Sequence, residues 1–136
     1  MNKFSKDINK YYFNLLLKGD KVFYTIIDDK IYLSDSYIIS IINKDDFLLN
    51  IEKLINVDLR IFFNKLNEFD YRNIKTWYAH EDIISLLDDN NYKVNINKKY
   101  FKLYHDMSFK IFENIKPVIV YNNDEIIGLI LPIKVY

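Results

Sequence analysis

Two histidines and their acidic neighbours are the residues whose types suggest catalysis or metal binding. His80 precedes Glu81 and Asp82, and His105 precedes Asp106. A zinc or hydrolytic site needs several convergent ligands, or a nucleophile beside a positioned base, and this chain has no cysteine and no HExxH spacing. We therefore predict that both histidines are ordinary surface or partly buried side chains.

The aspartate pair Asp28 and Asp29 also has the chemistry of a metal or acid–base site. The pair lies between two β-branched runs, where local hydrogen bonding in a hairpin turn explains it. The two glycines, Gly19 and Gly128, stand far apart, so the sequence offers no glycine-rich phosphate-binding loop. These observations predict a protein without catalytic activity, cofactor or metal.

The charges of the chain balance, with 19 basic and 19 acidic residues. The net charge of zero therefore gives no general attraction to nucleic acid or anionic lipid. Locally, residues 93–110 carry five lysines and one aspartate, whereas residues 81–91 carry four acidic residues and no basic one. Lys98, Lys99 and Lys102 in the basic stretch are the candidate nucleic-acid-binding residues.

Aromatic residues are unusually frequent, with 12 Tyr, 10 Phe and one Trp. Some of the tyrosines must lie at the surface, where rigid amphipathic rings favour protein interfaces and base stacking. The single tryptophan, Trp77, is the candidate anchor of such an interface. We predict that Trp77, Tyr78 and Tyr71 bind a partner.

The first half of the chain shows two kinds of periodicity. Apolar residues recur at helical spacing over residues 5–18 and Gly19 follows, which predicts an amphipathic helix. Residues 22–27 and 31–33 predict a hairpin, and residues 37–42 a third strand. Asp45 or Asp46 is expected to cap a helix through residues 47–55. A short helix is expected over residues 59–66, with a buried strand as the alternative.

The second half begins with an aromatic segment, residues 69–80, which predicts a strand with Trp77 and Tyr78 on opposite faces. A short element over residues 83–87, a turn at 88–91 and a strand over 92–96 follow. A helix over residues 97–107 is expected to bury Tyr100, Phe101 and Tyr104. Residues 117–120 and 126–135 predict a closing hairpin that turns at residues 122–124, where Asn and Asp tolerate left-handed backbone.

These elements predict one α+β domain over residues 1–136, with an antiparallel sheet covered by two or three helices. The apolar runs are too short to span a membrane, and the N-terminus does not resemble a signal peptide. We therefore expect a cytoplasmic protein. The open edges of a lone sheet need covering, which favours pairing with a second copy, so we expect a homodimer.

Three features of the last third of the chain form a recognisable series: an asparagine-bearing strand that leads into a helix at residues 95–100, then Pro117, and the terminal Leu-Pro-Ile-Lys of residues 131–134. With these features the last third resembles the closing domain of bacterial DNA sliding clamps. Residues 30–41, KIYLSDSYIISI, are similar to small phage-encoded clamp-like proteins. The resemblance implies a sliding-clamp-like fold whose basic helix faces DNA. A clamp ring, however, has six such domains and a strongly basic inner surface, whereas this chain supplies one domain with a net charge of zero.

The function expected from these features is that of a non-enzymatic interaction protein of phage or mobile-element type. It would bind a protein component of nucleic-acid machinery, for example as an inhibitor of a host defence nuclease of the anti-CRISPR kind. The excess of Asn, Ile, Lys, Tyr and Phe follows from AT-rich codons and agrees with such an origin. The alternative is a clamp-related DNA replication accessory factor that contacts DNA through its basic helix.

Overall fold

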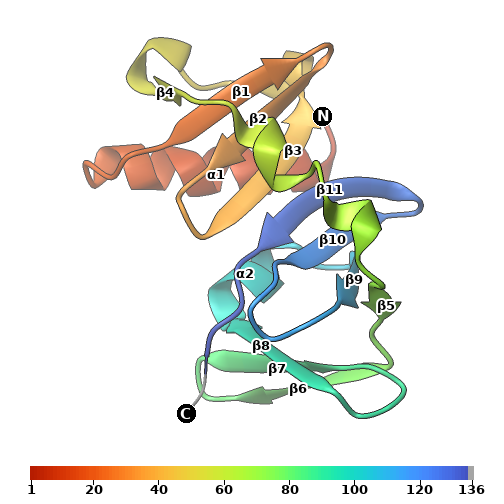
Figure 1. Ribbon diagram of the computed structural model, residues 1–136. Coiled ribbons are helices and arrows are strands. Elements are labelled where there is room, and N and C mark those ends of the chain that lie inside the picture. Colours follow the sequence, from red (N-terminus) through yellow and green to blue (C-terminus); the bar gives the residue numbers. More distant parts are fainter. Residues whose placement is uncertain (135–136) are drawn as a thin grey trace. The chain divides into compact units, whose positions relative to one another are not determined.

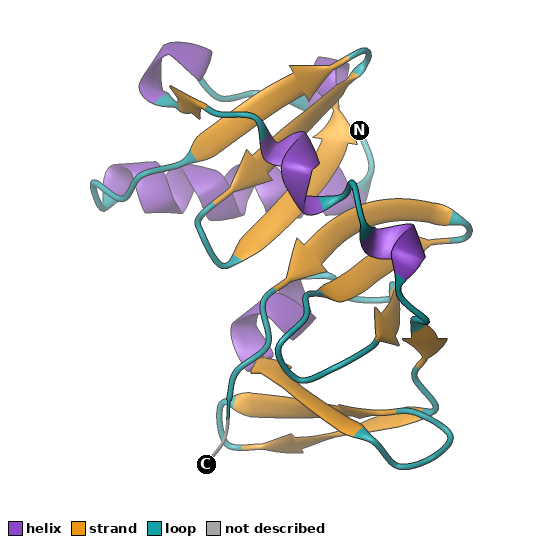
Figure 2. Ribbon diagram, in the orientation of Figure 1, coloured by secondary structure: helices purple, strands orange, loops and turns teal. Residues whose placement is uncertain are grey.

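The computed structural model describes residues 1–134 and groups the chain into two compact units (Figure 1). We call residues 1–64 the N-terminal unit and the described residues from 65 onward the C-terminal unit. Strands predominate over helices in both units (Figure 2), and the predicted α+β class is confirmed. The prediction of a single domain over residues 1–136 stays a prediction.

Helix α1 (Lys3–Leu17) begins the N-terminal unit and confirms the first predicted helix. The Asn2 side chain caps its start by accepting a 2.8 Å hydrogen bond from the Ser5 backbone N–H. The helix ends because Gly19 adopts φ 82°, and its N–H donates to the Leu16 carbonyl at 3.0 Å. Ile8 and Tyr12 are fully buried, so α1 packs the predicted apolar stripe into the core.

Strands β1 (Phe23–Ile27), β2 (Lys30–Ser34) and β3 (Ile38–Asn43) form the predicted antiparallel meander. Asp28 has φ 54° and Asp29 follows it in the β1–β2 turn, which confirms the turn interpretation of this pair. In the core, the Tyr12 hydroxyl donates to the Leu33 carbonyl at 3.0 Å. This bond ties α1 to β2.

The predicted helix over residues 45–55 is wrong. The chain instead forms the 3₁₀ turns η1 (Lys44–Asp46), η2 (Ile51–Lys53) and η3 (Leu59–Phe62), with the short strand β4 (Ile55–Asn56) between the last two. The Asn50 and Asp58 side chains each accept a hydrogen bond from the backbone N–H two residues later. A new short turn therefore begins after each of them, and no continuous helix forms. Strand β4 pairs in parallel with β1, so the expectation of a purely antiparallel sheet is also wrong.

The C-terminal unit begins with the 3₁₀ turn η4 (Leu66–Glu68) and the two-residue strand β5 (Arg72–Asn73). The helix predicted over residues 59–66 is thus replaced by the short turns η3 and η4. Strands β6 (Thr76–His80), β7 (Ile83–Leu87) and β8 (Lys93–Asn97) then form an antiparallel sheet in the order β6-β7-β8. The strands predicted within residues 69–80 and over 92–96 and the turn at residues 88–91 are confirmed, and the short element over residues 83–87 is the strand β7.

Helix α2 (Lys98–Leu103) is shorter than the predicted helix over residues 97–107. The Asn97 side chain caps its start by accepting a 2.9 Å bond from the Lys99 N–H. The helix ends early because the backbone leaves helical geometry at Tyr104, with ψ 35°, and Asp106 adopts φ 65°. Tyr100 and Tyr104 are buried as predicted, but Phe101 is only half-buried.

Strands β9 (Ser108–Ile111), β10 (Val118–Asn122) and β11 (Glu125–Ile130) complete the unit, in the order β11-β10-β9-β5. The closing hairpin is confirmed, with Asn123 at φ 56° in its turn. Strand β11 ends at Ile130, before Pro132, and Ile133 then forms an isolated bridge with Asn95. The predicted last strand residue, Val135, lies outside the described residues.

A buried carboxylate links three segments of the C-terminal unit. The Asp88 side chain is 2% exposed and accepts a 2.6 Å bond from Arg72 Nε. It also accepts bonds from the backbone N–H groups of Asn90 at 2.8 Å and Tyr92 at 2.9 Å. Arg72 Nη2 donates to the Phe112 carbonyl at 2.9 Å. The pair therefore holds β5, the β7–β8 turn and the end of β9 together.

Candidate functional site

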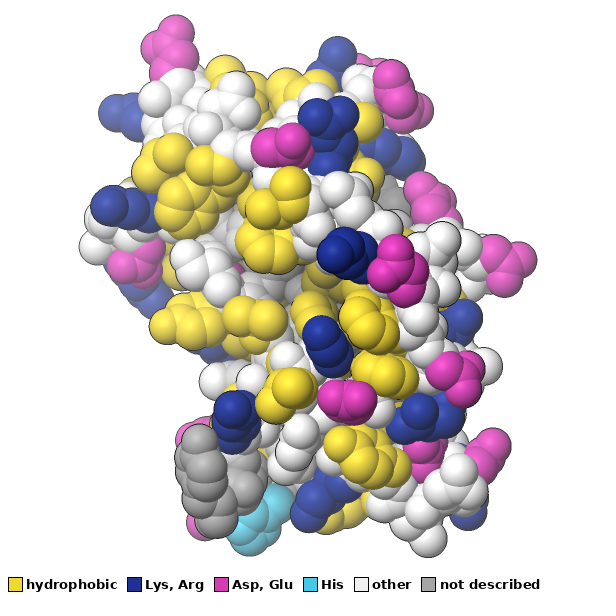
Figure 3. Space-filling model, viewed as in Figure 1, with side chains coloured by type: hydrophobic (Ala, Val, Ile, Leu, Met, Phe, Trp, Pro, Cys, Tyr) yellow, Lys and Arg dark blue, Asp and Glu magenta, His cyan; other side chains and the backbone are white. Residues whose placement is uncertain are grey.

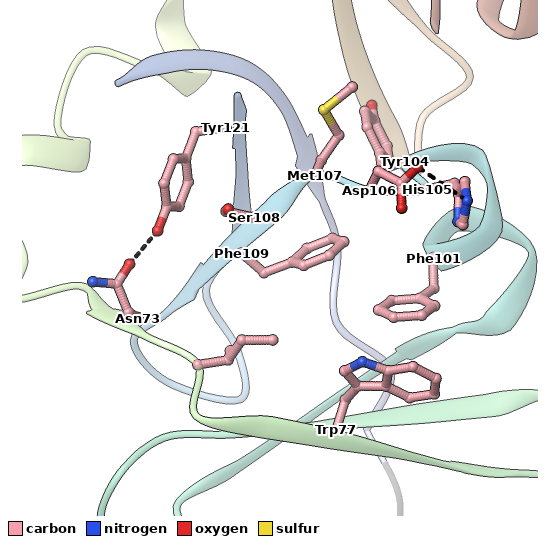
Figure 4. Close-up of a pocket in the computed structure, with 11 residues that line it drawn as sticks. Asn73, Trp77, Phe101, Tyr104, His105, Asp106, Met107, Ser108, Phe109 and Tyr121 are labelled. Atoms are coloured by element: carbon pink, nitrogen blue, oxygen red, sulfur yellow. Dashed lines mark hydrogen bonds and ion pairs between the residues drawn. The ribbon is translucent and has the colours of Figure 1, made fainter. Parts of the chain in front are cut away.

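An open cleft of about 530 Å³ lies in the C-terminal unit (Figure 4). Three stretches of chain form its walls: the β5–β6 segment, helix α2 with the turn that follows it, and strands β9 and β10. The lining residues are Asn73, Ile74, Trp77, Phe101, Tyr104, His105, Asp106, Met107, Ser108, Phe109 and Tyr121. The cleft falls within the size range of ligand-binding pockets, and five of its eleven lining residues are Trp, Tyr or Phe.

A row of three aromatic rings forms the apolar wall of the cleft. The Trp77 and Phe101 ring centroids are 4.7 Å apart, and Phe101 stacks on Phe109 at 5.3 Å with an interplanar angle of 21°. Trp77 pairs across the sheet with the buried Leu86, so its ring lies on the inner, core-facing side of β6. Because β6 is the end strand of its sheet, the ring is only partly covered and stays 49% exposed.

Polar groups lie at other parts of the cleft lining. The Tyr121 hydroxyl donates to the Asn73 side-chain oxygen, and Lys110 Nζ lies 5.0 Å from the Tyr121 ring centroid. His105 Nε2 lies 3.1 Å from Asp106 Oδ2, and both side chains are largely exposed. The cleft therefore combines an aromatic wall with hydrogen-bonding groups that can orient a bound side chain.

The three predicted partner-binding residues do not form one surface. Trp77 lines the cleft, whereas Tyr78 pairs with Ser85 on the opposite face of β6, as predicted. A hydrogen bond with Ser85 lowers the pKa of Tyr78 from its ordinary value. Tyr71 is half-buried and donates a 2.7 Å bond to the Pro117 carbonyl, and burial raises the pKa of Tyr71 to about 12. Tyr71 thus has a structural contact rather than a free surface.

The three candidate lysines lie on one side of α2. At about 100° per residue, Lys98, Lys99 and Lys102 fall within one arc, and the buried Tyr100 and Tyr104 lie on the other side. Lys98 is half-buried, and Lys99 Nζ lies 4.9 Å from the Tyr100 ring centroid. No lysine is among the residues that line the cleft. The basic arc and the aromatic cleft are therefore separate features of the same unit.

Charges of both signs are mixed on one face of the molecule. On the face of the molecule drawn in Figure 3, the described Lys and Arg side chains are interspersed with Asp and Glu, without a continuous field of one sign. His80 is exposed at the end of β6, apart from the cleft lining. Residues 1–134 contain no group of three His, Cys, Asp or Glu side chains that could hold a metal ion.

A second groove, of about 590 Å³, lies in the N-terminal unit between the end of α1 and the segment before η2. It is lined by apolar side chains that include Phe13, Leu17 and Leu48, which are 49%, 69% and 67% exposed. Unlike the Trp77 cleft, this groove has no stacked aromatic rings among the contacts found in the described residues. The groove therefore offers exposed apolar surface, but its lining gives less indication of the kind of group it would bind.

Comparison with known proteins does not place this chain in a family. No protein-family model matches the chain, and neither the curated proteins nor the solved structures include a significant match. The resemblance to sliding clamps therefore stays a prediction. No helix within the described part of the chain is long and apolar enough to cross a membrane.

Several residues of the cleft have no signal in the sequence. Phe101 and Phe109 have the spacing of ordinary core residues, and Asn73 and Tyr121 stand 48 positions apart. Only the folded chain brings these residues beside Trp77. The one usable signal in the sequence is the single tryptophan within an aromatic segment, and Trp77 does line this cleft.

Proposed function

We propose that this protein is a non-enzymatic binding protein whose aromatic cleft receives an apolar or aromatic side chain of a protein partner. The observation that carries the proposal is the half-exposed Trp77 ring, held against Phe101 in the cleft wall. Tryptophan in a preformed pocket is a frequent hot spot, because its large ring is desolvated on binding at little cost in side-chain entropy. The partner proposed from the sequence is a component of nucleic-acid machinery, such as a host defence nuclease.

The charges favour a protein over nucleic acid as the occupant of this cleft. Affinity for a polyanion depends on several lysine or arginine contacts to phosphates. The cleft lining contains no lysine or arginine, and the net charge of the chain is zero. Desolvation of aromatic rings therefore dominates binding here, and the affinity should depend only weakly on salt.

The test uses the purified protein and a partner captured from host lysate and identified by mass spectrometry. Calorimetry then compares Trp77→Ala with Phe13→Ala, a matched control because both rings are 49% exposed and Phe13 lies in the N-terminal unit. We expect Trp77→Ala to weaken binding by about 30-fold or more, and Phe13→Ala to leave it unchanged. Equal effects of the two substitutions would contradict the proposal.

The alternative function is direct contact with DNA through the basic arc of α2. The specific observation in its favour is that Lys98, Lys99 and Lys102 share one side of the helix. Changing all three to Glu should then abolish binding, and the affinity should fall steeply with salt. Loss of every captured partner after nuclease treatment would favour this function over the first.

A further inference from the structure

Within residues 1–134, strand β6 pairs with another strand along one edge only, and its other edge is open. It pairs with β7 on one side and is the end strand of the order β6-β7-β8. All five of its residues, Thr76–His80, are exposed. At the opposite edge, β8 is bridged at Asn95 by Ile133. An exposed edge of this length presents unpaired backbone donors and acceptors that pair readily with another strand.

We propose that two copies of this chain associate through β6, in an antiparallel pairing centred on Tyr78. The interface is isologous: the two-fold axis passes through the Tyr78 pair, and every other contact occurs twice. The three-stranded sheets of the two copies then form one continuous sheet. This inference does not rest on the proposed function, because the open edge of β6 is present whether or not the cleft binds a partner.

The charges at the two ends of β6 select the antiparallel direction. Lys75 precedes the strand, and the acidic turn residues Glu81 and Asp82 follow it. An antiparallel second copy brings Lys75 of each chain beside the partner's acidic turn, so two attractive contacts form. A parallel copy would instead place like charges side by side at both ends, which is destabilising.

The side chains within β6 select the register. Pairing centred on Tyr78 places Trp77 opposite the partner's Ala79, and the small alanine leaves room beside the indole ring. The two Tyr78 rings meet on the outer face as a cross-strand aromatic pair. Centring on Trp77 would crowd two indole rings together, and centring on Ala79 would move Lys75 past the acidic turn.

Single-cysteine crosslinking tests the register directly, because the native chain has no cysteine. Residues that face each other in antiparallel strands have Cα atoms about 4.5–5.5 Å apart, which suits a disulfide. Tyr78→Cys should therefore convert to a covalent dimer under mild oxidation. Thr76→Cys is the matched control: two copies of residue 76 are offset by about 13 Å along the strands in this register and should not crosslink. Equal crosslinking of the two variants would overturn the proposal.

Charge reversal with the cysteine-free protein tests the contacts at the ends of the strand. Light scattering at tens of micromolar should give the mass of a dimer for the native chain. Lys75→Glu and Glu81→Lys should each weaken the dimer about tenfold, and the double variant Lys75→Glu/Glu81→Lys should restore it. Both changes are on exposed side chains, and circular dichroism verifies that each of the three variants folds. A native chain that stays monomeric refutes the proposal and leaves the β6 edge to an extended segment of another protein.

Discussion

Replacing Arg72 with methionine would leave a carboxylate unpaired inside the C-terminal unit. Asp88 is 2% exposed and Arg72 is 33% exposed, so the pair is largely shielded from water. Removing one partner of a buried ion pair costs about 3–5 kcal/mol, and the partial exposure of Arg72 places this case at the lower end. We expect Arg72→Met to lower the free energy of unfolding by about 3 kcal/mol, equivalent to about 10 °C in Tm.

The effect should depend on pH in a defined direction. Burial raises the pKa of Asp88, but the hydrogen bonds from Arg72 and from the backbone N–H groups of Tyr92 and Asn90 outweigh it and lower the pKa overall. A carboxyl group whose pKa is lower in the folded than in the unfolded chain stabilises the fold fully at pH values above its unfolded pKa, near 4. This stabilisation is lost as the pH falls through the folded pKa. The difference between native chain and variant should therefore be full at pH 7 and shrink below about pH 4.

Urea denaturation is followed by two signals: tryptophan fluorescence, because the only tryptophan, Trp77, lies in the same unit as Arg72, and circular dichroism, which also reports the N-terminal unit that contains the control residue Arg60. The control is Arg60→Met, which removes an ion pair whose partners, Arg60 and Asp58, are 61% and 50% exposed. This control should not shift the midpoint measurably, because exposed ion pairs contribute little. The reasoning is refuted if Arg72→Met unfolds at the midpoint of the native chain, or if its deficit is the same at pH 3 and pH 7.

Two further substitutions test other buried polar groups. Asn9→Leu removes a 2.8 Å bond to the Asp46 carbonyl and a 2.9 Å bond from the Leu48 N–H, and should cost about 2–3 kcal/mol by thermal unfolding; an unchanged Tm would show that these bonds do not hold the segment. The folded pKa of Tyr71 is about 12, so its contribution to stability is complete below pH 10 and is lost as the pH rises toward 12. Tyr71→Phe has no ionisable hydroxyl and should therefore show a smaller loss of stability at alkaline pH. Parallel declines in both proteins would contradict the assignment.

The hairpins and the first helix could be predicted from the sequence because their signals are local. Asp28 and Asn123 adopt the left-handed backbone that their turns require, and Gly19 ends α1 in the same way. The segment after β3 could not be predicted, because its apolar residues recur at helical spacing while Leu48 and Ile55 are exposed. Side chains in this segment form hydrogen bonds with nearby backbone groups and interrupt the helix. The spacing of the apolar residues does not reveal such bonds.

The candidate site was predictable only in part. The sequence identified Trp77 and its position opposite Tyr78 across β6, because strand periodicity sets which residues share a face. It grouped Tyr71 with them by proximity in the chain, whereas the structure gives Tyr71 a contact with Pro117 instead. The other walls of the cleft come from distant segments, and no local pattern predicts their meeting.

The pairing of β5 with β9 bears on the order in which the C-terminal unit folds. Arg72 faces Ile111 and Asn73 faces Lys110, so this short ladder closes a long excursion of chain that contains β6, β7, β8 and α2. Neighbouring strands in a hairpin meet early, whereas contacts between distant residues wait on a larger loss of chain entropy. The cleft has walls on both sides of this closure, so we expect it to be completed late in folding, and binding of the proposed partner would then report that the whole unit has folded.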